Sequence, residues 1–215
     1  MAVVDLRGYV RGGAINGMPA GLQTNEKYEL FTAQGMPPYA ELTRQGVGWS
    51  VQTATLFAPL VAIPTTTAAL EVFNNTGTES LIVDTLFASQ VLSTAATQTY
   101  AIYACVSTKK AAPSNTALSI FSSSGRPVVA STGAGRVITA INTTVVANGW
   151  RPWGQVQAWG TAAATPGNSW HVNIDGRLIV PPDCALFLHV VGSIATASTF
   201  QVGASWYEAA VSNVV

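Results

Sequence analysis

The feature that most constrains the fold of this chain is a series of short strand-like runs separated by turn residues. Residues 199–208 alternate between apolar and more polar side chains, and the apolar positions are Phe200, Val202, Ala204 and Trp206. A period of two residues is typical of a strand with one buried face. Residues 81–87 and 99–106 are rich in the β-branched and aromatic residues that strands prefer. These runs predict an all-β protein.

The turn residues favour a sandwich. Asp175-Gly176 lies between two strand-like runs and predicts a hairpin, because a type I′ turn needs positive φ at both central residues. Asn74-Asn75-Thr76-Gly77 precedes the strand-like run at residue 81, and Asn148-Gly149 is a further candidate turn. We expect about eight to ten strands, and about 165 residues suit the two four-stranded sheets of a jelly roll. The predicted fold is therefore a jelly-roll-like antiparallel β-sandwich.

Composition changes near residue 50. Residues 1–48 contain runs such as Arg11-Gly12-Gly13 and show no sustained period, apart from a short helical turn expected around residues 38–44. We therefore expect residues 1–48 to form an extended, mostly irregular N-terminal arm and residues 49–215 to form the sandwich domain.

The chain carries few charges. Charged residues make up 9% of it and hydrophobic residues 48%, and ten basic residues balance ten acidic ones. An average soluble domain has about 25% charged residues, and net charge normally opposes association. This composition favours a surface covered by copies of the same chain or by a larger assembly. An uncharged surface rich in Thr, Ser and Gln is the alternative.

Nucleic acid and membranes are not expected partners. Phosphate binding needs clustered basic residues, and Lys109-Lys110, the one adjacent basic pair, is followed by loop-like residues. The uncharged residues 45–70 and 85–108 are interrupted by Thr, Ser, Gln and Pro, so neither predicts a spanning helix. Residues 1–8 lack the basic start and apolar run of an export signal.

Candidate catalytic residues are few. His171, Asn173 and Asp175 are spaced to project from one face of a strand, where they could form a proton relay or part of a metal site, or simply an exposed strand face. His189 lies in an apolar run, which favours a core or interface histidine bonded to the backbone. We therefore expect no catalytic, cofactor-binding or metal-binding site.

Two further features have structural interpretations. Cys105 and Cys184 lie in apolar strand-like runs and are expected to be free, buried thiols, with a disulfide as the alternative. Gly133-Ala134-Gly135-Arg136 is followed by strand-like residues instead of a helix, so we expect a loop and not a phosphate cradle.

The most distinctive local motif contains three tryptophans within ten residues. Trp150, Arg151, Trp153 and Trp159 are the candidate partner-binding residues. Trp and Arg dominate the binding energy of protein interfaces, and tryptophan rings can also stack on sugars. Filling the core at an edge of the sandwich is the third interpretation.

Several segments resemble a known protein class. Residues 38–44, residues 61–68 leading into a strand, and the C-terminal residues 178–186 and 200–208 are similar to structural proteins of tailed bacteriophages with a jelly-roll fold. Such proteins include capsid decoration, or cement, proteins. The resemblance implies a non-enzymatic oligomer on the virion surface, made in the host cytoplasm and bound to a major capsid protein or another virion protein.

Three functional hypotheses follow from the motifs and the resemblance. The first is a capsid decoration protein that stabilises the phage head shell through protein–protein contacts, with the arm lying across neighbouring chains. The second is a tail- or fibre-associated adhesion module that binds host glycans through Trp150, Trp153 and Trp159. The third is a hydrolase that uses His171 and Asp175.

Overall fold

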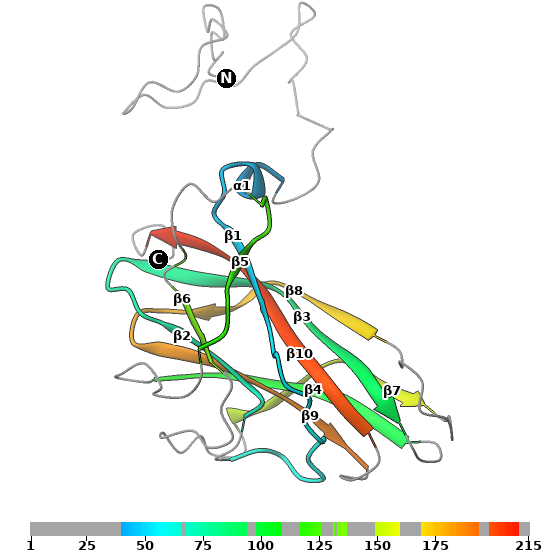
Figure 1. Cartoon of the computed structure of the whole chain (residues 1–215). Helices are drawn as coiled ribbons and strands as arrows, with labels where there is room; N and C mark the ends of the chain where they lie inside the picture. The colour runs from blue at the N-terminus through cyan, green and yellow to red at the C-terminus, as the bar shows by residue number, and fades with distance from the viewer. Residues whose placement is uncertain are drawn as a thin grey trace, which may run out of the picture. The chain divides into compact units, whose positions relative to one another are not determined.

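The chain folds into two antiparallel sheets packed face to face, each with five strands (Figure 1). A computed structural model describes residues 40–65, 68–93, 98–108, 117–125, 131, 133–136, 149–159, 169–193 and 198–210. Within these ranges the elements are α1 (Ala40–Arg44), β1 (Gly48–Gln52), β2 (Leu70–Asn74), β3 (Glu79–Ser93), β4 (Gln98–Thr108), β5 (Phe121–Ser122), β6 (Gly133–Arg136), β7 (Arg151–Trp159), β8 (Ser169–Val180), β9 (Cys184–Gly192) and β10 (Ser198–Ala210). The prediction of an all-β fold is confirmed.

The strand order is that of a jelly roll. The first sheet has the order β5-β1-β10-β3-β8 and the second has the order β6-β2-β9-β4-β7. Apart from the short β5 and β6, each strand is followed by one in the other sheet, except that β4 is followed by its neighbour β7. The last strand, β10, returns beside β1. Such double Greek-key connectivity defines the fold, so the predicted jelly-roll-like sandwich is confirmed.

The short strands correct one prediction. Residues Gly133–Arg136 were expected to form a loop, but they form β6 and pair with β2, with Gly135 opposite Val72. Glycine disfavours strands only weakly when a neighbouring strand offers its backbone groups. The sheets therefore have five strands each instead of the four expected, because β5 and β6 each extend one edge.

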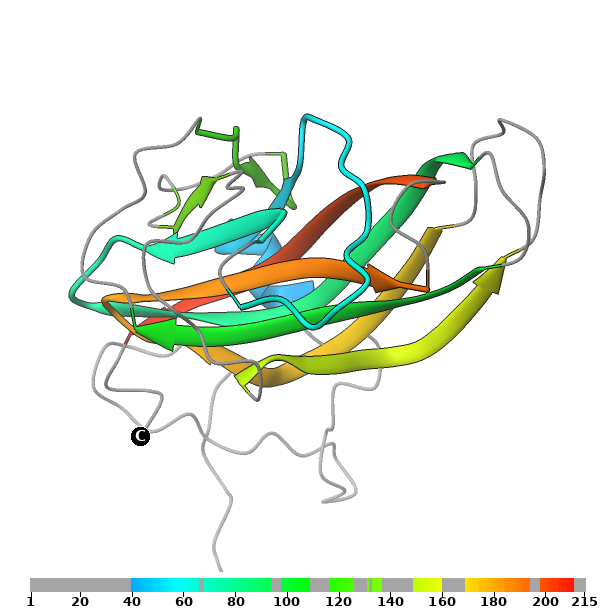
Figure 2. The same cartoon turned by 90° about the horizontal axis from the view of Figure 1, so that it is seen from below.

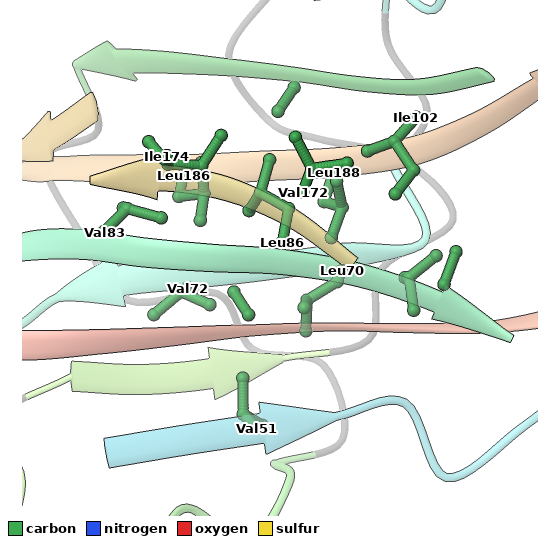
Figure 3. Close-up of a cluster of buried hydrophobic side chains, with 14 of the residues drawn as sticks. Val51, Leu70, Val72, Val83, Leu86, Ile102, Val172, Ile174, Leu186 and Leu188 are labelled. Carbon is green, nitrogen blue, oxygen red and sulfur yellow. The ribbon is translucent and has the colours of Figure 1, made fainter. Parts of the chain in front are cut away.

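The main core lies between the two sheets and is built from alternate residues of their strands (Figure 3). On β10 the predicted alternation is confirmed, since Phe200, Val202, Ala204 and Trp206 are all buried. Labelled side chains from both layers meet in Figure 3: Val51, Leu70, Val72, Val83, Leu86, Ile102, Val172, Ile174, Leu186 and Leu188. Burial of this apolar surface, at about 25 cal/mol per Å², is the main stabilising contribution to the fold.

A second apolar cluster lies on the other side of the second sheet. It contains Ala68, Phe73, Cys105, Trp150, Ala185 and Phe187. Strand β9 is therefore buried on both faces, which agrees with the unbroken apolar run in its sequence. Figure 2 shows β9, β4 and β7 side by side in this sheet.

The Asp175-Gly176 dipeptide does not form a hairpin, so that prediction is wrong. Both residues have positive φ, 51° and 74°, as expected, but β8 continues through them in one direction. Val83 of β3 pairs with Leu178, and Thr85, two residues further along β3, pairs with Asn173. The four residues of β8 between these two pairs therefore have only one residue of β3 opposite them. The dipeptide is thus part of a large β-bulge, in which residues 174–177 of β8 lie opposite Asp84, because β3 supplies a continuous partner on both sides of it.

The turn at Asn74 connects the two layers. The Asn74 side-chain amide donates hydrogen bonds to the carbonyls of Glu79 (2.8 Å) and Val180 (2.9 Å), and its Oδ1 accepts one from the Thr76 N–H (3.1 Å). Asn74 is fully buried, so these bonds satisfy a side chain that would otherwise destabilise the core. The turn predicted at residues 74–77 is confirmed as the link from β2 to β3.

The segment before β1 is attached to the first sheet. The expected helical turn is α1, and the Val47 carbonyl accepts a hydrogen bond from the Glu208 N–H (3.2 Å). The compact unit that contains the sandwich begins at Leu42. The predicted arm falls mostly on residues 1–39, which lie outside the described residues, so the division between residues 48 and 49 stays a prediction.

Candidate functional site

Trp150 belongs to the outer apolar cluster of the second sheet. Its side chain is 3% exposed, and its ring centroid lies 6.4 Å from that of Phe187. A ring enclosed in this way has no face left for a sugar or a protein partner. Trp150 therefore matches the core-filling interpretation.

Trp153 packs on a different surface. It lies on β7, the edge strand of the second sheet, and is half-buried against the main core between the sheets. The guanidinium of Arg177, on the edge strand of the first sheet, lies over the Trp153 ring at 5.6 Å from its centroid. A cation–π contact of this kind contributes about 0.5–1 kcal/mol at an exposed site. The pair links the two sheets at one edge.

Arg177 also holds the β-bulge of β8 in place. Its Nε donates a hydrogen bond to the Ile174 carbonyl (2.9 Å) and its Nη2 donates one to the Asn173 carbonyl (2.6 Å). These carbonyls belong to the bulged part of β8, where the regular pairing with β3 is interrupted. The edge of the sandwich is thereby shaped by Arg177 and does not present a regular strand for pairing.

The other two predicted binding residues also lie on β7. Arg151 is exposed at the start of the strand, and the Trp159 backbone pairs with Gln98 at its far end. The side chain of Trp159 lies outside the described part of the structure. Trp150 directly precedes β7 and the other three residues lie on it. Trp150 and Trp153 face different clusters, so these two do not form one stacking platform. A role of Arg151 and Trp153 in partner binding stays a prediction.

His171 and Asn173 are both exposed on the same face of β8, as the sequence predicts. Asp175 follows in the bulge, and the nearest ring to His171 belongs to Phe87, with centroids 5.5 Å apart. No group of three His, Cys, Asp or Glu side chains placed to hold a metal ion occurs within the described ranges. The hydrolase hypothesis therefore stays a prediction with no further geometric support.

His189 is a buried histidine bonded to the backbone, as expected. It is 3% exposed, its Nδ1 lies 2.8 Å from the Val190 carbonyl, and its ring meets Phe57 edge-on at 5.0 Å. Burial lowers the pKa of His189 to about 4, and the bond to Val190 only partly offsets this effect. The ring is therefore neutral at pH 7 and donates from Nδ1.

Both cysteines are free, as expected, but the expected burial is confirmed only for Cys105 and is wrong for Cys184. Cys105 is buried, and burial raises its pKa to about 12. Cys184 is half-buried, and its pKa is also raised, first by burial and then by the charge of Asp183. Neither thiol has the low pKa of a nucleophilic cysteine.

The loop between β1 and β2 presents an apolar surface that the sequence interpretation missed. Leu56, Val61 and Ile63 are exposed by 46%, 62% and 45%. The signal was the uncharged run of residues 45–70, which was weighed only as a possible membrane span. Within the part of the chain that the structure describes, no helix is long and apolar enough to cross a membrane.

This apolar loop, residues 53–65, is fixed to both sheets (cyan in Figure 2). Phe57 exchanges two backbone hydrogen bonds with Phe200 of β10, at 3.1 and 2.9 Å. Leu60 bonds to the Val190 carbonyl at 3.0 Å and accepts from the Gly192 N–H at 2.7 Å, both on β9. Its exposed side chains are therefore carried on an anchored backbone.

A shallow depression lies on the outer side of β4 and β9. Its lining includes Thr99, Tyr103, Val191, Gly192 and Ser193. Tyr100 and Ala101 complete the lining. The depression thus offers hydroxyl and backbone groups and two phenols, but no carboxylate, imidazole or thiol.

Comparison with known proteins identifies no relative. No family model, curated protein or solved structure matches the chain.

Proposed function

We propose that the protein is a non-enzymatic structural component of a phage virion, a decoration protein that binds and stabilises the head shell. The apolar loop of residues 53–65 carries this proposal. Its side chains Leu56, Val61 and Ile63 expose apolar surface to water. This exposure is unfavourable in a free monomer, and covering the surface with a partner is favourable.

The charge pattern supports a protein partner for this loop. Residues 45–70 contain no charged residue, and charge depletion is the compositional mark of an interface core. Since the loop is anchored to β9 and β10, little conformational entropy is lost when a partner covers it. A second copy of the chain and a capsid subunit are both partners within this proposal.

The ionisable residues support a structural role. His189 is neutral and enclosed, and the thiols of Cys105 and Cys184 have raised pKa values. These three groups are poor candidates for acid–base or nucleophilic chemistry.

The rival adhesion hypothesis, in its original form, is weakened by the placement of Trp150. A glycan platform built on Trp150, Trp153 and Trp159 needs open rings, and the Trp150 ring is 3% exposed within the outer cluster.

The test is attachment to purified phage particles lacking this protein, measured by co-sedimentation. The double variant Leu56→Asp/Val61→Asp should lose attachment while keeping the melting temperature of the parent, because both side chains point into water in the free protein. Phe121→Asp is the matched control, since Phe121 is an apolar residue 65% exposed on β5 and outside the loop.

Two outcomes would count against the proposal. One is full attachment of the loop double variant. The other is absence of the parent protein from particles analysed by mass spectrometry. A copy number matching the shell subunits indicates a head position, whereas a few copies per particle indicate the tail.

A further inference from the structure

The outer side of the first sheet is divided into two halves by the bulged row of β3 and β8. On one half, Tyr207, Ile82 and Ile179 share a row, and the Tyr207 hydroxyl lies 3.2 Å from the Thr43 hydroxyl near α1. Beyond the bulge the residues change in character. This second half, called the neutral face below, carries no Asp, Glu, Lys or Arg among its described positions.

The pairing register places the neutral face in three rows across β1, β10, β3 and β8 (Figure 1). The central row joins Gln52, Gly203, Phe87 and His171. The row toward the bulge joins Ser50, Ser205, Thr85 and Asn173, and the row on the other side contains Gln201, Ser89 and Ser169. Short hydroxyl and amide side chains therefore surround one aromatic row.

Phe87 lies against the backbone of β10 at the centre of this face. A Cβ atom added to Gly203 would be 2.1 Å from Cζ of Phe87 and 2.3 Å from Cε2. The ring thus occupies the space in which any other residue at position 203 would place its side chain. Glycine at this position lets the end of the ring approach the backbone of β10 closely.

His171 extends the aromatic surface toward the edge. Its ring centroid lies 5.5 Å from that of Phe87, and the two planes differ by 30°. His171 is exposed and Phe87 is partly exposed. Together they form one tilted aromatic pair that spans β3 and β8.

Amide groups flank the aromatic pair on both sides. On the β1 side, Gln52 Nε2 donates a hydrogen bond to Gln201 Oε1 (2.9 Å), and Gln201 Nε2 donates one to the Thr53 carbonyl (3.3 Å). On the other side the exposed Asn173 lies two residues from His171 along β8. Amides both donate and accept hydrogen bonds, which suits hydroxyl groups.

We propose that the neutral face binds a neutral polysaccharide, with pyranose rings stacked on Phe87 and His171 and their hydroxyls bonded to Gln52, Gln201 and Asn173. The apolar C–H face of a pyranose ring matches a flat aromatic surface. A few placed polar groups beside an apolar surface are the usual arrangement for recognition of a small molecule.

The composition of the face argues against other occupants. Nucleic acid needs cations along its phosphates, and the face provides none. Hot spots of protein interfaces are enriched in Trp, Tyr and Arg, and the rows of the neutral face contain none of these. The site uses no side chain of the apolar loop of residues 53–65, so it can fail without affecting the proposed attachment to the shell.

Native gel electrophoresis in the presence of hydroxyethylcellulose, dextran, yeast mannan or laminarin tests the inference. At least one of these neutral polymers should retard the parent protein, equally at low and high salt because no ion pair takes part. Removing one stacking ring should weaken binding about tenfold, which is the effect of losing about 1.4 kcal/mol. The variants are His171→Ala and Phe87→Leu, which keeps Gly203 covered.

Matched variants separate stacking from folding. Phe87→Tyr retains a flat ring and should bind within about threefold of the parent. Thr108→Ala, at an exposed position on β4 in the other sheet, should bind like the parent. Gln52→Ala changes an exposed side chain without disturbing Phe87, so weaker binding by this variant supports the site even where Phe87→Leu is less stable.

Three results would overturn the inference. They are no retardation by any of the four polymers, unchanged retardation in the Phe87→Leu/His171→Ala double variant, and strong loss of binding at high salt. If the polymers fail and the same double variant converts an oligomer into monomers in sedimentation, the face instead joins two copies of the chain.

Discussion

The outer sides of the two sheets each carry a phenylalanine and a histidine, but in opposite environments. On the second sheet Phe187 is fully buried and His189 is 3% exposed. On the first sheet Phe87 is partly exposed and His171 is exposed. The comparison shows that the second sheet buries apolar side chains on both of its sides. The first sheet, where it carries the neutral face, buries them only on the side that faces the core.

The sequences of the strands explain the difference. Strand β9 reads CALFLHVVG, an almost unbroken apolar run, whereas β8 begins SWHVN, with apolar residues at alternate positions. Continuous runs mark strands covered on both faces, and alternating runs mark strands with one face in water. The two outer faces therefore perform different tasks, one adding to the core and the other remaining open for contacts.

The largest expected effect comes from truncating the two phenylalanines. Phe187→Ala should lower the free energy of unfolding by about 3–5 kcal/mol, because it leaves a cavity in a closed cluster. Phe87→Ala removes a ring that is already partly in water and should cost about 1–2 kcal/mol. Urea denaturation measures both, and equal losses would contradict the contrast between the faces.

His189 and His171 extend the comparison to the dependence of the protein's stability on pH. The pKa of His189 is about 4 in the folded protein and about 6.5 when unfolded, so protonation favours the unfolded chain. The stabilisation is fully present above about pH 6.5 and is lost as the pH falls toward 4, by about 2–3 kcal/mol.

Denaturation curves at pH 7 and pH 4.5 measure this effect. His189→Gln should reduce the difference in stability between the two pH values, whereas His171→Gln at the exposed position should leave it in place. A difference that stays the same in His189→Gln would assign the effect to other groups.

Substitution of Gly203, on the neutral face, is expected to destabilise the protein. In Gly203→Ala the new methyl group would meet both the Phe87 ring and, at 2.5 Å, the Val51 carbonyl oxygen, which belongs to the backbone and cannot move aside. We expect a loss of about 2 kcal/mol. Gly77→Ala is the control, since no atom lies within 4 Å of its Cβ position, and thermal melts of both variants show whether close approach is the cause.

The smallest expected effect concerns the edge at which the two sheets meet. Arg177→Ala removes two hydrogen bonds to bulge carbonyls and the contact with the Trp153 ring, and should cost about 1 kcal/mol. Arg177→Lys keeps the charge but not the fork of donors, so it should recover only part of the loss in chemical denaturation. Full recovery of stability in Arg177→Lys would mean that the positive charge alone accounts for the stabilising effect of Arg177.

Local patterns predicted much of the fold. The alternation of residues 199–208 identified β10 and its buried face, and the turn at residues 74–77 was placed correctly. The burial of His189 and Cys105 was also predicted correctly, because an apolar strand-like run encloses the polar residue that it contains. Residues such as these interact with their immediate neighbours in sequence, so the sequence carries enough information. Cys184, at the start of its strand, is only partly buried.

The candidate sites were predicted less well. The tryptophan motif was treated as one unit, but Trp150 and Trp153 pack against different clusters. Strand β7 contains a bulge near Gly154, whose φ is +75°, and this breaks the regular pairing with β4. The two sites developed here, the apolar loop and the neutral face, each combine residues from several separate segments, which spacing along the chain does not reveal.

By itself the sequence determined that this is a β protein with an apolar core, few charged residues and positive φ at Asp175-Gly176. Only the tertiary structure decided whether that dipeptide reverses the chain or bulges within a strand, because both outcomes use the same backbone angles and differ in which strand lies opposite. It also decided that Gly203 lies beneath Phe87 and that Leu56, Val61 and Ile63 stay in water. Backbone conformation depends on a few neighbouring residues, whereas pairing and exposure depend on strands that are distant in sequence.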